Sequence, residues 1–184
     1  MVISIIGYTD RRPVLYTLMK LCQKLGDTAV VTDDRHLARL IVGEELPYYQ
    51  NTLISVTDES IDEWLDSAEY NVEDFEYIIA DGKLAATADV VIFCVGCIKT
   101  EDEQDEVEYL DEYISIGMCN AAKEKNRFKW TPATFENLER FEGVKQMVEI
   151  DSNLTRILAT ELAAKFNLSA DQIRKVVKSK CRLE

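Results

Sequence analysis

Short apolar runs alternate with amphipathic segments along the first part of the chain. The run Val2–Ile6 is rich in β-branched residues and predicts a buried strand. In residues 14–25 the apolar positions recur at intervals of three and four and stop at Gly26, which predicts an amphipathic helix. A second apolar run, Thr28–Thr32, predicts another strand, and a helical pattern follows over residues 35–42. This β-α-β-α order is typical of α/β proteins.

Three further apolar runs predict strands in the middle of the chain. They cover residues 53–56, 75–81 and 88–95, and only a short polar connection separates the last two. Strands that are apolar at nearly every position are buried on both faces, as in a parallel sheet covered by helices. We therefore expect a doubly wound α/β fold with a largely parallel sheet. An acidic stretch follows the first of these runs, and its apolar positions form the stripe of a helix: Ile61, Trp64, Leu65 and Ala68.

The rest of the chain is helical in pattern. The acidic run 101–106 predicts the start of an exposed helix that includes Val107, Leu110 and Ile114. Breaks in the helical pattern follow near Pro132, Gly143 and residues 167–169.

The length and composition fit a globular protein with a sizeable core. The chain has 184 residues, 47% of them apolar, and we expect an α/β domain over residues 1–130 and a helical C-terminal region over residues 131–184. No apolar run approaches the length that spans a bilayer, and no signal peptide is readable at the N-terminus. Five cysteines, an odd number, are unlike a disulfide framework and favour a reducing compartment. We therefore expect a cytoplasmic protein without a membrane segment.

The net charge of −13 argues against general affinity for nucleic acids, because neutralising phosphates requires clustered lysine and arginine. The charge is uneven, however. Residues 152–184 carry seven basic and three acidic side chains, a net charge of +4, whereas the other residues carry −17. Two interpretations remain open for this basic end, namely a contact with nucleic acid or a partner, and a solvated helix face.

The segment after the first predicted strand has the layout of an anion-binding loop. A strand, a glycine turn at Gly7 and a helix N-terminus form such a frame, although residues 7–13 contain no lysine. Arg11 and Arg12, next to Gly7 and Thr9, could hold a phosphate or a carboxylate with help from the helix dipole. The alternative is a solvated loop whose arginines pair with the acidic surface.

Three segments of the chain resemble the ParA/MinD-like group of P-loop ATPases. They are the strand, glycine loop and helix of residues 2–25, the second strand with Asp33 after it, and the strand Tyr77–Asp81 followed by residues 88–92. The resemblance covers roughly residues 1–98 and implies a P-loop-ATPase-like domain. It further implies that Asp81 lies on the magnesium side of a nucleotide site and Asp33 on its switch side.

The chain departs from that group in its chemistry. Both lysines of the phosphate loop are missing, and Lys20, the nearest, would lie about two turns into the helix. The link between the strands at 75–81 and 88–95 is also shorter than in the family. We therefore expect a pseudo-ATPase without catalytic residues, metal or cofactor, which acts as an adaptor or regulatory protein through a protein partner and forms a homodimer. Such a small acidic protein is compatible with a phage or plasmid source as well as a chromosomal one.

In one alternative interpretation the protein still binds a nucleotide. In that interpretation the protein is an atypical nucleotide-binding ATPase, and hydrolysis has moved to unfamiliar groups. Its candidate anion and nucleotide ligands are Gly7, Thr9, Arg11, Arg12, Asp33 and Asp81.

Cys94 and Cys97 have the spacing of a redox or metal motif. A redox site of this kind needs the first cysteine at the start of a helix, which the sequence after Cys97 does not predict. A zinc site needs two more ligands, and the candidates are scattered. The alternative interpretation is a pair of buried cysteines at the end of a strand. The remaining candidate zinc ligands are Cys119, Cys181 and His36.

Residues 158–178 resemble a helix-turn-helix unit. In that interpretation Ser169 caps the second helix and Ile173, Val176 and Val177 pack inward. This resemblance implies a DNA-binding regulator or partition-type protein, whereas an αα-hairpin that covers the sheet or docks a partner is the alternative. The residues facing a DNA groove would be Gln172, Arg174, Lys175 and Lys178.

Overall fold

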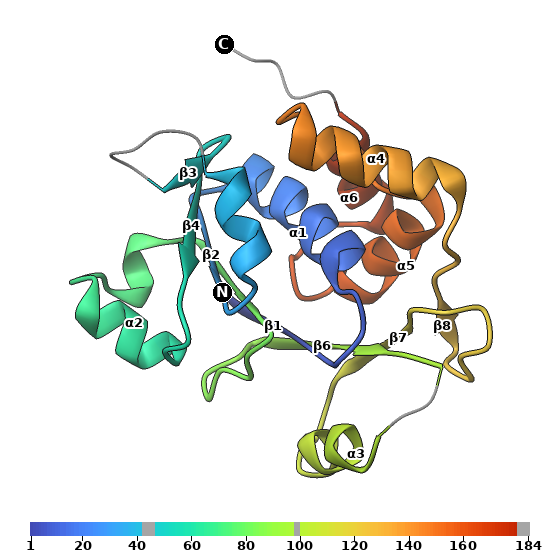
Figure 1. Ribbon diagram of the computed structural model, residues 1–184, viewed down its shortest axis with the longest axis horizontal. Coiled ribbons are helices and arrows are strands. Elements are labelled where there is room, and N and C mark those ends of the chain that lie inside the picture. The colour runs from blue at the N-terminus through green and yellow to red at the C-terminus, as the bar shows by residue number, and fades with distance from the viewer. Residues whose placement is uncertain (42–46, 98–99, 180–184) are drawn as a thin grey trace.

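An eight-stranded sheet runs through the centre of the molecule (Figure 1). The structure is a computed structural model and describes residues 1–41, 47–97 and 100–179. The strand order is β3-β4-β2-β5-β1-β6-β7-β8, and every neighbouring pair is parallel except β3 and β4. The strands are β1 (Val2–Ile6), β2 (Thr28–Thr32), β3 (Tyr48–Tyr49), β4 (Thr52–Val56), β5 (Tyr77–Asp81), β6 (Val90–Val95), β7 (Ile114–Gly117) and β8 (Asn126–Arg127).

Helices cover both faces of this sheet, which confirms the predicted doubly wound α/β fold (Figure 1). The first, fourth, fifth and sixth α-helices lie on one face, and the second and third lie on the other. The helices are α1 (Arg12–Leu25), α2 (Ile61–Ser67), α3 (Glu101–Glu108), α4 (Pro132–Gly143), α5 (Ser152–Leu162) and α6 (Ala170–Lys178), with the 3-10 helices η1 (Arg35–Leu40) and η2 (Val72–Asp74).

Local sequence signals explain where several helices begin. Pro13 occupies the first turn of α1, where its missing N–H leaves no hydrogen bond unmade. Ser60 and Glu63 cap the start of α2 reciprocally, and Asp151 accepts hydrogen bonds from the backbone at the start of α5. Each cap satisfies backbone donors that would otherwise lack partners.

Residues of β1 alternate between two core regions. Ile3 and Ile5 contact the α1 face, whereas Val2 faces the region under α2. On the α1 face the ring of Phe141 stacks on Tyr16 at 4.3 Å, and its carbonyl accepts a hydrogen bond from Tyr49 at 2.7 Å. The C-terminal helices thus share their core with the sheet and with α1.

Short strands account for the errors in the predicted elements. Ile114 was expected in the helix that starts with the acidic run, yet it is the first residue of β7. β3, β7 and β8 were not predicted, because two to four residues of mixed polarity carry no clear periodicity. The helical pattern at residues 35–42 forms the 3-10 helix η1 as far as Leu40, and Val42 lies outside the described residues.

Within the described part of the chain, no helix is long and apolar enough to cross a lipid bilayer.

Candidate functional site

The carboxyl ends of β1, β5 and β2 form the candidate site. The chain builds the sheet to one side of β1 first and crosses to the other side with β6, so the strand order reverses at β1. In open α/β sheets, ligands bind outside the carboxyl ends of the strands at such a reversal. Gly7, Asp33 and Asp81 follow or end these strands, and Arg11, the residue at the N-cap of α1, reaches them.

Arg11 lies at the centre of this cluster. Its Nε donates to Oδ1 of Asp81 at 2.8 Å, and its Nη1 donates to the carbonyl oxygen of Gly7 at 2.7 Å. Its Nη2 lies 3.7 Å from Oδ1 of Asp33. The second oxygen of Asp81 accepts a hydrogen bond from the hydroxyl of Thr32 at 2.9 Å. Both carboxylate oxygens of Asp81 therefore have partners within the protein.

The Arg11–Asp81 pair is largely removed from water. The side chain of Asp81 is 3% exposed and that of Arg11 18% exposed. Burial raises the pKa of Asp81, and the charge and hydrogen bond of Arg11 and the hydroxyl of Thr32 oppose this rise. Burial lowers the pKa of Arg11, but the attraction and hydrogen bond of Asp81 outweigh it, so the pKa is raised overall. The guanidinium thus balances a carboxylate charge that would be costly to bury alone.

Two glycines allow the close approach of these groups. Gly7 has φ +113°, and a Cβ there would lie 2.1 Å from the carbonyl oxygen of Cys94. Gly82 has φ +76°, and its Cβ would lie 2.5 Å from Oδ1 of Asp33 and 2.9 Å from Nη2 of Arg11. Gly7 was predicted from the sequence but Gly82 was not, although a glycine directly after a strand-ending aspartate is a visible turn signal.

Arg12 turns away from this cluster toward α4. It pairs with Asp10 at 2.7 Å and with Glu142 at 3.1 Å. Glu142 also accepts a hydrogen bond from the hydroxyl of Tyr16 at 2.8 Å and forms an ion pair with Arg39. The structure therefore brings together Gly7, Arg11, Asp33 and Asp81 but not Arg12. Thr9 is half-buried in the loop between β1 and α1.

Replacing Glu142 with alanine is expected to lower the unfolding free energy by about 2 kcal/mol, because the hydroxyl of the buried Tyr16 and two guanidinium groups lose their shared acceptor. Urea unfolding measures the change. The matched control is Glu139→Ala, an exposed glutamate on the same helix, which should change stability by less than about 0.5 kcal/mol. Equal effects in the two variants would contradict the role given to Glu142.

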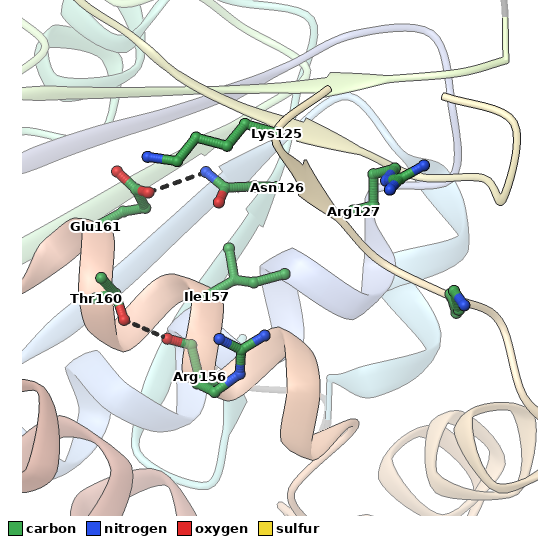
Figure 2. A pocket seen from close by; sticks show the side chains of 8 residues that line it. Lys125, Asn126, Arg127, Arg156, Ile157, Thr160 and Glu161 are labelled. Carbon is green, nitrogen blue, oxygen red and sulfur yellow. Dashed lines mark hydrogen bonds between the residues drawn. The ribbon is translucent and has the colours of Figure 1, made fainter. Parts of the chain in front are cut away.

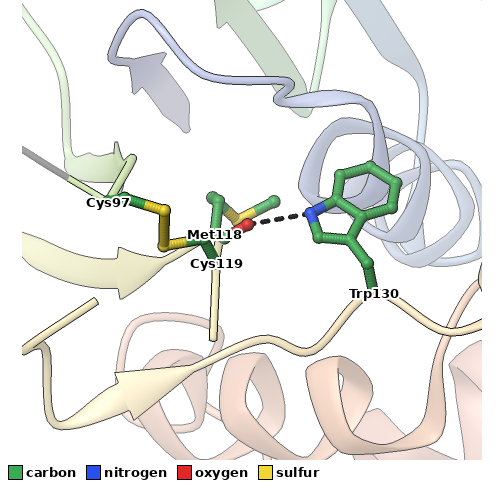
Figure 3. The surroundings of a disulfide bond; sticks show 4 residues. All are labelled: Cys97, Met118, Cys119 and Trp130. Atoms are coloured by element: carbon green, nitrogen blue, oxygen red, sulfur yellow. Dashed lines mark hydrogen bonds between the residues drawn. A yellow bond between two sulfur atoms is a disulfide. The ribbon is translucent and has the colours of Figure 1, made fainter. Parts of the chain in front are cut away.

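The cysteines do not form the pair that their spacing indicates. Cys97 is bonded to Cys119, and this disulfide joins the segments that follow β6 and β7 (Figure 3). Beside it, the indole nitrogen of Trp130 donates to the carbonyl of Met118 at 2.8 Å. Cys94 is a buried free thiol in β6.

One expectation about cysteine needs correction. Cys97 is exposed rather than buried at the strand end, because it lies beyond β6 in the bend that follows the strand, where it is bonded to Cys119. Among the described residues, no three histidine, cysteine or acidic side chains are grouped so that they could hold a metal ion. Cys181 lies outside those residues.

α5 and α6 form the helix pair that the tail pattern indicates. Ser169 accepts a hydrogen bond from the backbone of Gln172 and caps α6, while Ile173 and Val177 are buried. Val176 is half-buried against the same core. Of the candidate DNA-contacting residues, Gln172, Lys175 and Lys178 are exposed, and Arg174 is partly exposed and pairs with Asp171.

No protein-family profile and no curated protein sequence matches this chain.

Proposed function

We propose that the protein is a non-catalytic scaffold related to the ParA/MinD-like ATPases, which works in the cytoplasm as an adaptor or regulatory protein through protein–protein contacts. The position of Arg11 is the observation that supports this most strongly. Its guanidinium is bonded to Asp81, the residue that the resemblance places on the magnesium side of a nucleotide site.

A nucleotide would have to displace these internal partners. Phosphoryl-transfer sites use a lysine and a magnesium ion to neutralise the phosphates. In this chain Asp81 already has a permanently charged partner, because arginine does not lose its proton in proteins. Lys20 is buried in the middle of α1, well away from the first turn where a phosphate would lie.

Exposed apolar side chains near the cluster supply a contact surface for a partner. Tyr8 directly follows Gly7 and is 66% exposed, and Leu84 lies three residues after Asp81 and is 47% exposed. Exposed aromatic and apolar side chains are typical anchors of protein interfaces. A second copy of this chain is the partner that the resemblance favours, since ParA/MinD-like proteins dimerise face to face across a nucleotide. A nucleotide-free relative would pair through the same surface or through its helical tail.

A melting-temperature screen against ATP, GTP, their diphosphates and magnesium tests the loss of nucleotide binding. A ligand raises the melting temperature only if it binds the folded protein. Because the proposal holds that nucleotide binding is lost, we expect no ligand to raise the melting temperature of the wild-type protein by more than about 1 °C. Asp81→Asn serves as the comparison, since it keeps the shape of the side chain and removes its charge.

A magnesium-dependent rise with one nucleotide that disappears in Asp81→Asn would contradict the proposal. That outcome would favour the atypical nucleotide-binding ATPase instead.

A second candidate function is DNA binding through the C-terminal helices. The exposed polar and basic face of α6, with its apolar face turned inward, favours this candidate. The same face also fits a helix hairpin that covers the sheet, since α6 packs on α5 and α1. Loss of duplex binding in the triple variant Arg174→Ala, Lys175→Ala and Lys178→Ala would support DNA contact.

A further inference from the structure

A basic groove lies between the strand segment around β8 and helix α5 (Figure 2). Its volume is about 440 Å³. Three of its basic side chains come from the strand segment, and the fourth, Arg156, comes from α5. Glu161 is the one acidic residue of the lining, and its Oε1 accepts a hydrogen bond from the amide of Asn126 at 3.0 Å. The three basic residues of the strand segment are Lys125, Arg127 and Lys129.

The strand segment places its basic residues at alternate positions. Lys125, Arg127 and Lys129 are exposed, whereas Phe128 between the last two is fully buried. β8 is only two residues long, and the consecutive residues Lys125, Asn126 and Arg127 all line the groove. Arg156 faces the groove from the helix opposite (Figure 2).

These four cations are unusual in such an acidic protein. The net charge is −13, yet within the described residues no carboxylate oxygen lies within 4 Å of any of the four cationic groups. Arg156 donates instead to the amide oxygen of Asn153 at 2.8 Å. Charged residues on an edge strand also protect it from pairing with other strands, but that role requires no cation on a facing helix. The charges fit an anionic ligand with more than one negative group.

An aromatic pair follows these cations in the chain and lies outside the residues that line the groove. Trp130 is the next residue after Lys129, and its ring stacks on Phe135 of α4 at 5.0 Å. Phe135 is 51% exposed, so an apolar ring surface is open to solvent. A positively charged groove combined with aromatic stacking surfaces is how proteins bind single-stranded nucleic acids without sequence preference.

We propose that this basic groove binds the phosphate backbone of a single-stranded nucleic acid, with a base stacked on Phe135. A single strand has unstacked bases that can stack on an exposed ring such as Phe135, whereas the bases of a duplex are already stacked on one another. The site is separate from both the Arg11 cluster and the exposed face of α6, and it does not depend on the proposed function.

Fluorescence anisotropy with a labelled oligothymidylate at several salt concentrations tests this proposal. The groove variant is Arg127→Ala, Lys129→Ala and Arg156→Ala. We expect it to bind at least tenfold more weakly than the wild-type protein. Its plot of log affinity against log salt should be less steep by about 2, because three phosphate contacts at roughly 0.7 each are lost. Phe135→Ala should weaken binding by roughly tenfold through lost stacking, with little change in the salt dependence.

The matched control removes the same charge from other surfaces. Lys24→Ala, Arg35→Ala and Arg140→Ala takes three positive charges from exposed positions in α1, η1 and α4 and should leave the oligothymidylate affinity within about threefold of the wild-type value. Thermal unfolding followed by circular dichroism verifies that each variant is folded.

Several outcomes would overturn the proposal. Equal losses in the groove variant and the control variant would mean general attraction to positive charge. Binding that is lost in Arg174→Ala, Lys175→Ala and Lys178→Ala but kept in the groove variant would assign single-strand binding to α6. Absence of wild-type binding at 50 mM salt would overturn it as well. Preference for duplex DNA, inorganic tripolyphosphate or vesicles of anionic lipid over the oligonucleotide would assign the groove to a different anion.

Discussion

Replacing Arg11 with leucine is expected to lower the unfolding free energy by about 3–5 kcal/mol, the usual range when one partner of a buried ion pair is removed. The carboxylate of Asp81 would keep only the hydroxyl of Thr32 as a partner, in a position that is 3% exposed. The carbonyl of Gly7 would also lose its donor. Chemical denaturation at pH 7 measures the change.

The effect of Arg11→Leu should depend on pH. Burial already raises the pKa of Asp81, and removing the opposing charge of Arg11 raises this pKa further. A carboxyl group whose pKa is higher in the folded state destabilises the fold as the pH rises through that value. We therefore expect the variant to be closest to the wild-type protein below the ordinary aspartate pKa of 3.8 and to lose stability progressively toward neutral pH.

Two further variants sharpen this experiment. In Arg11→Leu with Asp81→Leu no unpaired charge remains, so the double variant should be more stable than Arg11→Leu alone. Arg35→Leu is the matched surface control. The side chains of Arg35 and Asp58 are 87% and 83% exposed, and Nη2 of Arg35 lies as far as 3.9 Å from Oδ2 of Asp58. It should change stability by less than about 0.5 kcal/mol. Two results would contradict the charge balance described for Asp81. One is a double variant that is no more stable than Arg11→Leu, and the other is a loss of stability in Arg11→Leu that does not depend on pH.

Reduction of the Cys97–Cys119 disulfide is expected to lower the unfolding free energy by about 3 kcal/mol. The bond closes a loop with a sequence separation of 22 residues, and the chain-entropy account gives this magnitude for such a loop. The corresponding fall in melting temperature is roughly 6–12 °C. Cys97 is exposed, so a soluble thiol reagent can reach the bond. Thermal unfolding with and without dithiothreitol measures the shift.

Cys119→Ser provides the control for this measurement. The variant should melt near the temperature of the reduced wild-type protein and should not respond to dithiothreitol. Thiol titration of the denatured wild-type protein should find two more reactive thiols after reduction than before. An equal response of the variant to dithiothreitol, or an unchanged thiol count, would exclude the disulfide as the source of the shift.

Much of the fold could be predicted from local sequence. The β-branched runs of β1, β2, β5 and β6 are buried on both sides, and this burial is what makes their residues apolar at nearly every position. β3 and β8 are two-residue strands at the two edges of the sheet, and their sequences are too short to carry a period.

The candidate site was predicted only in part. Gly7, Arg11, Asp33 and Asp81 were identified because glycine and charged residues that follow strands meet at one edge of a parallel sheet. The partners within the cluster depend on contacts over 70 residues of sequence, such as that between Arg11 and Asp81, which no local pattern encodes.

Other groups were missed for similar reasons. The role of Glu142 depends on helix packing, since it meets Arg12 across 130 residues. The bond between Cys97 and Cys119 could not be inferred from spacing, because an odd number of cysteines leaves the connectivity open. The basic residues of the groove were visible in the sequence as three cations close together at positions 125, 127 and 129 of an acidic chain, and this local cluster is the signal that could have found it.

The strand order also determines when the centre of the sheet can form. β5 lies between β1 and β2, although the chain makes it after both of them. Val2 pairs with Ile78, 76 residues later, whereas β2 can pair with β4 over only 24 residues, as Thr28 does with Thr52. Contacts between residues so far apart in sequence form slowly, because a long loop must close first. A chain still being synthesised can thus pair β2 with β4 early. The ion pair between Arg11 and Asp81 can form only after residue 81 has been made.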